Sequence, residues 1–322
     1  MHRLKNAYEG RRAVVIFGGP SLIAQRVDFR RLAGKGAVIF LDAKALTPHF
    51  LSFGVEPDYF LMLFPEKCKD NSLQQFIFRS FLAGVNIQPF LKREYLPVLH
   101  EMQANFDTYF EPWHPHRGPH KRFRWKPGVY LKDSPFDLLR HLPNTRIIAN
   151  RQLLAEHFPE MPYPQPLYVF EHTKSAGDFV LEEYYTPIEQ PGAVLLRPTG
   201  FLNSAAIALY PLLAFMGFRE VYLLGMDMTM LGSLEYAALY TFRSMWHFRW
   251  FFWRTRHVFN AAYRANRPYY VRPQSEFEDA KRVLNDGRTA FIRVYAPWTY
   301  TAPMAGIRTV APEEFFSTSE ER

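Results

Sequence analysis

The sequence predicts an α/β fold of the Rossmann-like, doubly wound type, with a mostly parallel sheet and a helical lid or insertion. Short apolar runs recur and are bounded by charge or glycine, as in RAVVIFG (12–18), GAVIFLDA (36–43) and REVYLLGMDM (219–228). Such runs are typical of buried parallel strands. Each of the first two is followed by a turn and a segment of helical spacing, and this repetition predicts right-handed βαβ units.

The remaining elements follow from the same patterns. In the first half, helical spacing covers 22–33, a short helix within 44–55 stops near Gly54, and EPDYFLML (56–63) is a third strand. Further along we expect strands at 145–150, 167–171, 192–196 and 290–297 and helices at 150–158, 201–218 with a kink at Pro211, 233–266 as one long helix or a pair, and 275–287.

One domain accounts for the whole chain. Its 322 residues are 48% hydrophobic and 22% charged, enough to bury a large core and unlike a disordered chain. We expect a single Rossmann-like nucleotide-binding domain over 1–322. Within it, the weaker patterning of about 67–165 predicts a loop-rich insertion, and about 233–272 predicts a basic, aromatic helical lid.

The composition indicates in which cellular compartment the protein works and which kind of partner it binds. The single cysteine, Cys68, excludes an internal disulfide framework and a cysteine-based zinc cluster, which fits a reducing compartment. No signal-peptide pattern or membrane-length apolar run is present, so a cytoplasmic protein is expected. The net charge of +8 suits an anionic partner, such as a nucleotide, an acidic sugar, anionic lipid or nucleic acid.

The turn GGPS, made of Gly18, Gly19, Pro20 and Ser21, follows the first strand and opens a helix. Backbone N–H groups in this position bind anions, and glycine lets a ligand approach the backbone closely. The alternative is a plain tight turn with Ser21 as a helix cap. The turn matches neither the G-x-G-x-x-G fingerprint nor a P-loop.

Polar residues follow two further strands. Asp42 ends the second strand, where an acid commonly binds a ribose hydroxyl, although a cap for the next helix explains it equally well. A second strand-to-helix turn holds Arg197, Thr199 and Gly200. Because ligands bind at the carboxyl ends of parallel strands, these turns together predict a nucleotide site. The alternative for the second turn is a capped helix start.

Asp227 follows another predicted buried strand, in LLGMDMT. A lone aspartate there can serve as a catalytic base, a metal ligand or an orienting group. It is not part of a D-x-D pair, so the sequence does not favour a metal-dependent transferase. The alternative is a cap or a buried hydrogen-bonding residue.

The segment 242–259 is both basic and aromatic. On a helical wheel its basic side chains cover about half the circumference, and Trp and Phe fill the other half and intrude between the cations. The basic residues are Arg243, His247, Arg249, Arg254, Arg256 and His257. The pattern suits a helix in a membrane interface or a lid over an anionic substrate, and a core helix with extended arginines is the alternative. Nucleic acid is not expected, because no supporting module accompanies it.

Three blocks, VVIFGGPSL, GAVIFLDAKALTPHFLSFGVEPDYFLML and TGFLNSAAIALYPLLAFMGFREVYLLGMDM, occur in an order that resembles a known family. The chain is similar to the motility accessory factors and the related 6-hydroxymethylpterin diphosphokinase-like proteins, and to bacterial CMP-sialic acid sialyltransferases. The resemblance covers roughly half the chain. It implies a glycosyltransferase that moves an acidic sugar, a sialic acid-like nonulosonate or Kdo, from a CMP-activated donor to a saccharide or glycolipid acceptor in surface polysaccharide synthesis.

The resemblance also assigns site residues. The cytidine nucleotide would be held by Gly18 to Ser21 and Asp42, and the CMP phosphate would contact Thr199 and Gly200. Arg197 would supply positive charge. The family's asparagine within the glycine turn is missing here. Of the two tyrosines expected near the phosphate, one position holds Thr229, and Tyr236 approximates the other.

Catalysis is expected to need a base, since the acceptor hydroxyl must lose a proton. The candidates are His247, His257 and Asp227, although neither histidine sits in a motif that matches the family. CMP is a good leaving group, so we expect no cofactor and no metal. The alternatives are an ATP-dependent pterin diphosphokinase-like enzyme and a catalytically degenerate nucleotide-binding protein. The basic segment predicts a peripheral position at the inner face of the membrane.

Overall fold

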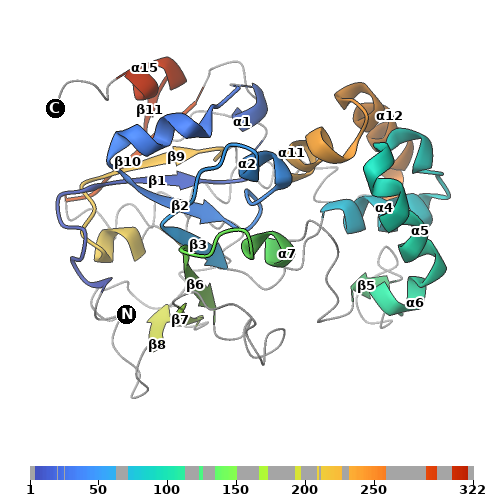
Figure 1. The fold of residues 1–322 in the computed structure, drawn as a ribbon, viewed down its shortest axis with the longest axis horizontal. Helices are drawn as coiled ribbons and strands as arrows, with labels where there is room; N and C mark the ends of the chain where they lie inside the picture. The colour runs from blue at the N-terminus through green and yellow to red at the C-terminus, as the bar shows by residue number, and fades with distance from the viewer. Residues whose placement is uncertain are drawn as a thin grey trace.

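The computed structural model shows an α/β protein built around a twisted sheet (Figure 1). The structure describes residues 4–19, 21–24, 26–62, 72–112, 123–125, 135–150, 167–172, 193–196, 209, 212–226, 232–258, 288–295 and 307–317. The sheet of the described residues has nine strands in the order β11-β10-β9-β1-β2-β3-β6-β7-β8, and every neighbouring pair is parallel.

The strands follow the apolar runs of the sequence. Their bounds are β1 (Arg12–Ile16), β2 (Val38–Asp42), β3 (Tyr59–Met62), β6 (Arg146–Asn150), β7 (Leu167–His172), β8 (Ala193–Leu196), β9 (Glu220–Leu224), β10 (Ala290–Val294) and β11 (Arg308–Val310). The chain moves outward from β1 to β8 on one side and then returns to continue as β9 to β11 on the other. The predicted Rossmann-like, doubly wound fold is therefore confirmed.

Each face of the sheet is covered, which is why its strands are apolar on both sides. Val14 and Ile16 of β1 face one core, while Ala13 and Val15 face the other. The first core is closed by α1 (Ser21–Ala24), η2 (Phe29–Lys35), α2 (Pro48–Leu51), α7 (Pro135–Leu139) and α15 (Pro312–Ser317). A helical stretch at 212–215 closes the second core. We call the sheet with these helices the sheet body.

The helix predicted over 22–33 is divided in two. Arg26 adopts a left-handed φ of 49°, and Asp28 then caps η2 by accepting the backbone N–H of Arg30 at 3.1 Å. A non-glycine residue in the left-handed region and an aspartate cap both interrupt a continuous helix. The short helix expected before Gly54 forms as α2 (Pro48–Leu51), and Gly54, with a φ of 66°, lies in the turn that follows it.

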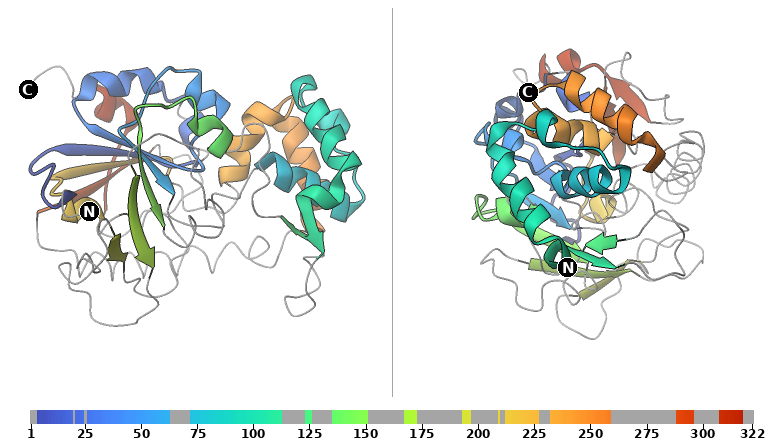
Figure 2. Two further views of the ribbon diagram at one scale, coloured as in Figure 1. Left: turned by 60° about the horizontal axis from the view of Figure 1, so that its bottom comes forward. Right: turned by 90° about the vertical axis from the view of Figure 1, so that its right-hand side faces the viewer.

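A second unit lies beyond the carboxyl ends of the strands (Figures 1 and 2). It consists of residues 72–112 and 232–258, with the short hairpin β4 (Phe110–Pro112) and β5 (Phe123–Trp125), and we call it the helical body. Its helices are α4 (Ser72–Ala83), η3 (Gln88–Phe90), η4 (Arg93–Tyr95), α5 (Leu96–Ala104), α6 (Phe106–Tyr109), α11 (Gly232–Thr241), α12 (Met245–Thr255) and η6 (Arg256–Val258).

The helical body joins two ranges that the sequence separates. Residues 72–112 belong to the expected loop-rich insertion, and in the structure they form helices. They share one core with the lid range, in which Phe76 of α4 contacts Phe242, Phe248 and Phe251 with ring centroids 4.9, 5.8 and 6.1 Å apart. The expected helix or helix pair from 233 is a pair, α11 and α12. The helices expected at 150–158 and 275–287, and Pro211, lie outside the described residues, except for Asn150, which ends β6.

The faces of α12 differ from the expected basic half and aromatic half. Phe248 and Phe251 are buried in the helical body, whereas Trp246 and Trp253 are exposed beside the arginines. The wheel placed Phe and Trp together because both are aromatic. In the structure they separate, because only one face of the helix packs against α4.

Candidate functional site

The strand order places a switch point between β1 and β9. From β1 the chain turns toward β2, and from β9 it continues in the opposite direction to β10. In open α/β sheets, ligands bind outside the carboxyl ends of the strands at this point. The turn after β1 contains Gly18, Gly19 and Ser21, and the turn after β9 contains Gly225 and Met226. The helical body lies at the same edge of the sheet (Figure 1).

Gly18 is required by close packing between two turns. A Cβ atom at this position would lie 2.6 Å from the carbonyl oxygen of Lys44, which belongs to the turn after β2. Real Cβ atoms do not approach a backbone oxygen so closely, so any side chain here would displace one of the two turns. The first glycine of the GGPS turn thus has a structural role, whether or not a ligand also approaches it.

Gly225 is a second close approach, which the sequence reasoning did not single out. It has a φ of 66°, and a Cβ atom there would lie 2.2 Å from the carbonyl oxygen of Phe17 and 2.8 Å from Cγ of Leu22. The turns after β1 and β9 therefore pack backbone against backbone at the switch point. The signal was present in the sequence as a glycine directly after the buried strand YLL, just before Asp227.

Ser21 is buried and begins α1, a helix of four residues. The backbone N–H of Leu22 donates to the carbonyl of Gly19 at 3.3 Å, so this N–H group already has an acceptor within the turn. A one-turn helix has few aligned peptide dipoles, so an anion would be held here by individual N–H groups and the serine hydroxyl.

Asp42 ends β2 and is 5% exposed. Its Oδ2 accepts the backbone N–H of Lys44 at 3.3 Å, which fixes the turn that packs on Gly18. The sequence left open whether Asp42 caps the next helix. In the structure that cap is Thr47, whose hydroxyl accepts the N–H of Phe50 at 3.1 Å. Asp42 thus holds the turn whose Lys44 carbonyl packs on Gly18, at the carboxyl ends of β1 and β2.

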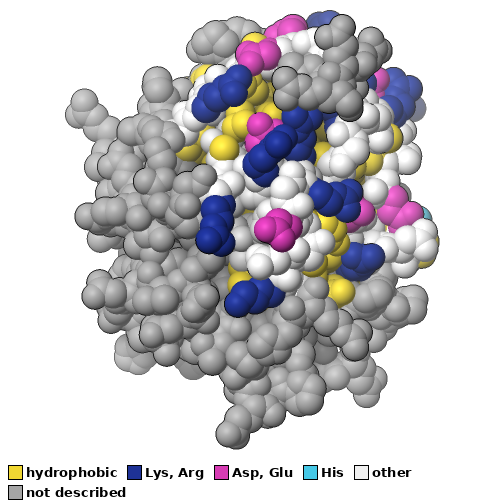
Figure 3. Space-filling model, turned by 90° about the vertical axis from the view of Figure 1, so that its left-hand side faces the viewer, with side chains coloured by type: hydrophobic (Ala, Val, Ile, Leu, Met, Phe, Trp, Pro, Cys, Tyr) yellow, Lys and Arg dark blue, Asp and Glu magenta, His cyan; other side chains and the backbone are white. Residues whose placement is uncertain are grey.

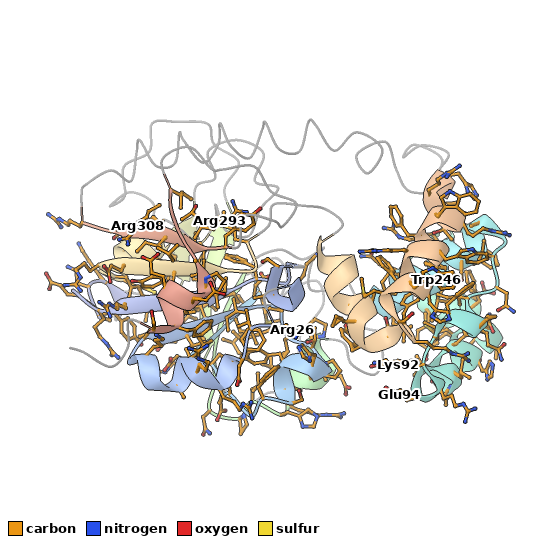
Figure 4. The ribbon with its side chains drawn as sticks, turned by 90° about the horizontal axis from the view of Figure 1, so that it is seen from above. Arg26, Lys92, Glu94, Trp246, Arg293 and Arg308 are labelled. Atoms are coloured by element: carbon orange, nitrogen blue, oxygen red, sulfur yellow. The ribbon has the colours of Figure 1, made fainter. Side chains whose placement is uncertain are left out.

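Three basic side chains come to the junction of the two bodies, and the sequence reasoning named none of them. Arg26 lies between the sheet body and the helical body, and Lys92 lies on the helical body (Figure 4). Lys92 is held by its Nζ, which donates to the carbonyl of Leu239 at 3.2 Å. His49 of α2 has a pKa below its ordinary value, first because burial disfavours the charged imidazolium and second because Lys92 is positive.

The lowered pKa of His49 decides its protonation state. Since its pKa is lowered from the usual 6.5, the imidazole is neutral at pH 7.5 and can accept a proton. The second cause comes from the other body, since Lys92 lies on the helical body and His49 on the sheet body. The sequence signal for His49 is its place on the short helix directly after the turn of Asp42.

The two predicted catalytic histidines lie elsewhere. His247 is half-buried on α12, where its Nδ1 is 2.7 Å from Oγ of Ser244, and His257 is exposed on η6. In Figures 1 and 2, α11 lies between α12 and the sheet. The structure therefore does not bring His247 or His257 together with Gly18 and Asp42.

Several predicted site residues are outside the described residues: Pro20, Arg197, Thr199, Gly200, Asp227 and Thr229. For Tyr236 the structure describes the backbone in α11. Within the described ranges, no group of three or more His, Cys, Asp or Glu side chains is arranged to hold a metal ion. Likewise, none of the described helices combines the length and hydropathy that crossing a membrane requires.

Comparisons with known proteins give few matches. No family model and no curated protein sequence matches the chain. Among solved structures, the chain is similar to one described as the structure of MAf glycosyltransferase from Magnetospirillum magneticum AMB-1. The alignment has 11% sequence identity and a TM-score of 0.36, and it covers 99% of this chain and 37% of that chain. The chain thus spans just over a third of the length of that protein, and a similarity of this size establishes no family.

Proposed function

We propose that the protein is a glycosyltransferase that moves an acidic sugar from a CMP-activated donor to a saccharide or glycolipid acceptor. The donor sugar would be a sialic acid-like nonulosonate or Kdo. The observation that carries the proposal is the packing of the Lys44 turn, which Asp42 fixes, on Gly18 beside the switch point of a doubly wound sheet. The order of the three sequence blocks that resemble CMP-sialic acid transferases supports the choice of nucleotide.

In this proposal the cytidine nucleotide lies across the carboxyl ends of β1 and β2. The N–H groups of the turn from Gly18 to Ser21 and the carboxylate of Asp42 hold it, and Arg197, Thr199, Gly200, Thr229 and Tyr236 complete the site. Arg26 and Lys92 add positive charge at the junction of the two bodies. Positive charge stabilises the phosphate as CMP departs, so the reaction is proposed to need no metal.

The reaction forms one bond and breaks another. The acceptor oxygen attacks the anomeric carbon as the bond from that carbon to the CMP phosphate breaks, with inversion. The proton of the acceptor hydroxyl passes to a base. The sequence proposes His247, His257 or Asp227 for this role. The structure adds His49, because it is neutral at pH 7.5 and lies on α2, the short helix that follows β2.

Ligand binding tests the nucleotide. Thermal shift with CMP, CDP, UDP, GDP and ATP, with and without magnesium, should show a preference for CMP. At 100 times its dissociation constant, CMP stabilises the folded state by about 2.7 kcal/mol. Preference for ATP with magnesium would instead indicate a pterin diphosphokinase-like enzyme, and no binding of any nucleotide would indicate a degenerate protein.

Two matched carboxylate substitutions, one of them a control, test where CMP binds. Asp42→Asn should abolish most of the CMP shift. Asp58→Asn is the control, because Asp58 also accepts a backbone N–H, from Ile39 at 2.8 Å, but stands at the amino end of β3. Equal loss in both variants would mean that the shift reports general stability, and unchanged binding in Asp42→Asn would remove Asp42 from the site.

Release of CMP during sugar transfer identifies the base. His49→Ala, His247→Ala, His257→Ala and Asp227→Asn are compared, each with its CMP shift measured in parallel. The base variant should keep the CMP shift and lose transfer by about 100-fold or more, the usual size of general-base catalysis. A variant that keeps both properties is excluded from the role.

A further inference from the structure

The outward face of α12 suits one kind of partner. We infer that this face, formed by Trp246, Trp253, Arg249, Arg254 and Arg256, docks on the surface of an anionic lipid bilayer. The inference concerns where the protein is held, and it does not depend on the proposed nucleotide or on sugar transfer.

The helix is anchored firmly on its inner side. Phe248, Phe251 and Thr255 are buried, and the hydroxyl of Thr255 donates to the carbonyl of Phe251 at 2.9 Å. Ser244 caps the first turn by accepting the backbone N–H of His247 at 3.3 Å. Because the inner face is fixed in the helical body, the opposite face is presented outward in one orientation.

Two tryptophans dominate the outward face. Trp246 is 67% exposed and Trp253 is 54% exposed, and they are among the few large hydrophobic side chains exposed in the described part of the chain. They are seven residues apart, so at 3.6 residues per turn they lie nearly in line along the helix. Trp250 is half-buried and lies one turn from each, along one edge of the same face.

Arginines flank the tryptophans on both sides. Arg249 lies one turn from both Trp246 and Trp253, on the opposite side from Arg254. The guanidinium of Arg254 lies 5.0 Å from the ring centroid of Trp250. That of Arg256 lies 5.0 Å from the ring centroid of Trp253. A tryptophan centre with a cationic border is the pattern of a helix that lies in the headgroup region of a bilayer.

The charge of the chain is concentrated in this region. Residues 236–275 contain seven arginines and no aspartate or glutamate, so they contribute +7 to a net charge of +8. The other 282 residues are therefore close to neutral. Four of these arginines, Arg243, Arg249, Arg254 and Arg256, lie in the described residues. A basic surface is attracted to anionic lipid over a distance of about 10 Å at moderate salt.

The opposite end of the molecule differs. The face at the amino ends of the strands shows basic and acidic side chains side by side (Figure 3). Two of the pairs are Arg12 with Glu220 at 2.7 Å and Arg308 with Glu314 at 3.1 Å. Basic residues are thus present on both ends, but in the described residues of α12 and η6 no carboxylate accompanies them.

A bilayer fits this face better than single-stranded nucleic acid does. Bases stack on aromatic faces along a basic groove. Here the aromatic rings stand on the outside of a helix, and the ring faces of Trp250 and Trp253 are already approached by arginine. An exposed helix face with central tryptophan instead presents its apolar surface to a flat, anionic interface.

Vesicle flotation of the intact protein tests the inference. Binding is expected to vesicles with about one third phosphatidylglycerol in phosphatidylcholine, and not to phosphatidylcholine alone. Replacing Arg249, Arg254 and Arg256 by Gln should weaken binding on the order of 100-fold, since each arginine near the surface contributes about fivefold. Trp246→Ser with Trp253→Ser should reduce binding by roughly tenfold and reduce the quenching of tryptophan fluorescence by brominated lipid.

Two controls match these variants. Phe81→Ser removes an aromatic side chain that is 54% exposed, as Trp253 is, but that lies on α4 with its ring centroid 4.4 Å from that of Phe106. Replacement of Arg30, Arg140 and Arg308 by Gln removes the same charge from exposed positions on the sheet body. Circular dichroism and thermal melting establish that all variants fold.

The inference is supported if both α12 variants lose binding and both controls keep it. Equal loss in the arginine control would show attraction by net charge alone and would overturn the inference. Absence of binding to anionic vesicles would overturn it as well. So would competition by single-stranded DNA at equal phosphate concentration that removes the protein from the vesicles completely.

Discussion

The sheet body and the helical body are built from chain segments of different kinds. In the sheet body, β1, β2 and β3 follow one another within residues 12–62, and each strand pairs with its neighbour in the chain. In the helical body, the core joins residues 72–112 with residues 232–258, which are more than a hundred residues later. Local apolar runs in the sequence are therefore enough to predict the sheet body, but they predict the helical body only in part.

Besides their shared core, the two distant segments are joined by backbone hydrogen bonds. Leu91 and Phe242 form an antiparallel bridge. The N–H of Arg243 is donated to the carbonyl of Phe90 at 2.9 Å, and the N–H of Lys92 to that of Thr241 at 3.0 Å. Backbone pairing of this kind leaves little signature in the sequence, because any residue other than proline can make it.

The largest expected effect comes from disrupting the core of the helical body. Phe76→Ala removes a fully buried ring from the helical body and should destabilise that body by about 3–5 kcal/mol, since a cavity remains among Phe242, Phe248 and Phe251. Hydrogen exchange resolved by mass spectrometry should rise in 72–112 and 232–258 together, while β1 to β3 keep their protection.

Phe40→Ala is the matched variant in the sheet body. Phe40 is also fully buried, and its ring stacks on Tyr59 with centroids 4.9 Å apart. We expect increased exchange in the sheet strands. If Phe76→Ala raised exchange in 72–112 but left 232–258 protected, the two segments would not form one cooperative unit, and the helical body as defined here would be wrong.

The next largest effect is expected where Gly225 packs against the carbonyl of Phe17 at the switch point. Gly225→Ala should lower the free energy of unfolding by roughly 3 kcal/mol or more, because alanine in the left-handed region costs about 1–2 kcal/mol and its Cβ would also meet the carbonyl oxygen of Phe17. Urea denaturation followed by circular dichroism measures the change.

Gly36→Ala separates these two causes. Gly36 has a φ of 58°, yet no atom lies within 4 Å of the position its Cβ would take. This variant should cost only the conformational part, about 1–2 kcal/mol. Equal costs for Gly36 and Gly225 would show that the turns after β1 and β9 can move apart, contrary to the packing seen at the sheet edge.

The fold could be predicted because buried parallel strands are apolar on both faces. The runs around Val14, Phe40 and Leu223 are therefore continuous and easily recognised. The break in the helix at 22–33 could not be predicted in the same way, because it depends on the left-handed backbone of Arg26, a conformation that arginine rarely adopts. The helical content of 72–112 was missed, although Leu73, Phe76 and Ile77 of α4 recur at the helical spacing i, i+3, i+4 and are buried in the core shared with α11 and α12.

The candidate site was predictable in part. Gly18, Ser21 and Asp42 were recognised because a turn after a strand lies at the carboxyl edge by topology. Gly225 was missed since its role depends on the distance to Phe17, and His49 because its pKa depends on burial and on Lys92, which lies 43 residues later in the chain. Contacts between segments that are far apart in the chain cannot be predicted from local sequence patterns.

The smallest expected effect lies at the junction of the two bodies and appears as a dependence on pH. The folded state lowers the pKa of His49 below 6.5, so the unfolded state binds more protons as the pH falls through about 6.5. His49 therefore reduces stability on acidification and has no such effect above that range. His49→Gln should make the melting temperature fall less between pH 7.5 and pH 5.5 than it does in the wild type.

Lys92→Met tests whether the two bodies communicate through this charge. Burial is the larger cause of the lowered pKa, so removing Lys92 should restore it only in part and give a pH dependence between those of the wild type and His49→Gln. An unchanged pH dependence in Lys92→Met, with the expected flattening in His49→Gln, would assign the shift to burial within the sheet body alone. The junction would then be a contact without electrostatic coupling, and Lys92 would lose its proposed part in holding an anion beside His49.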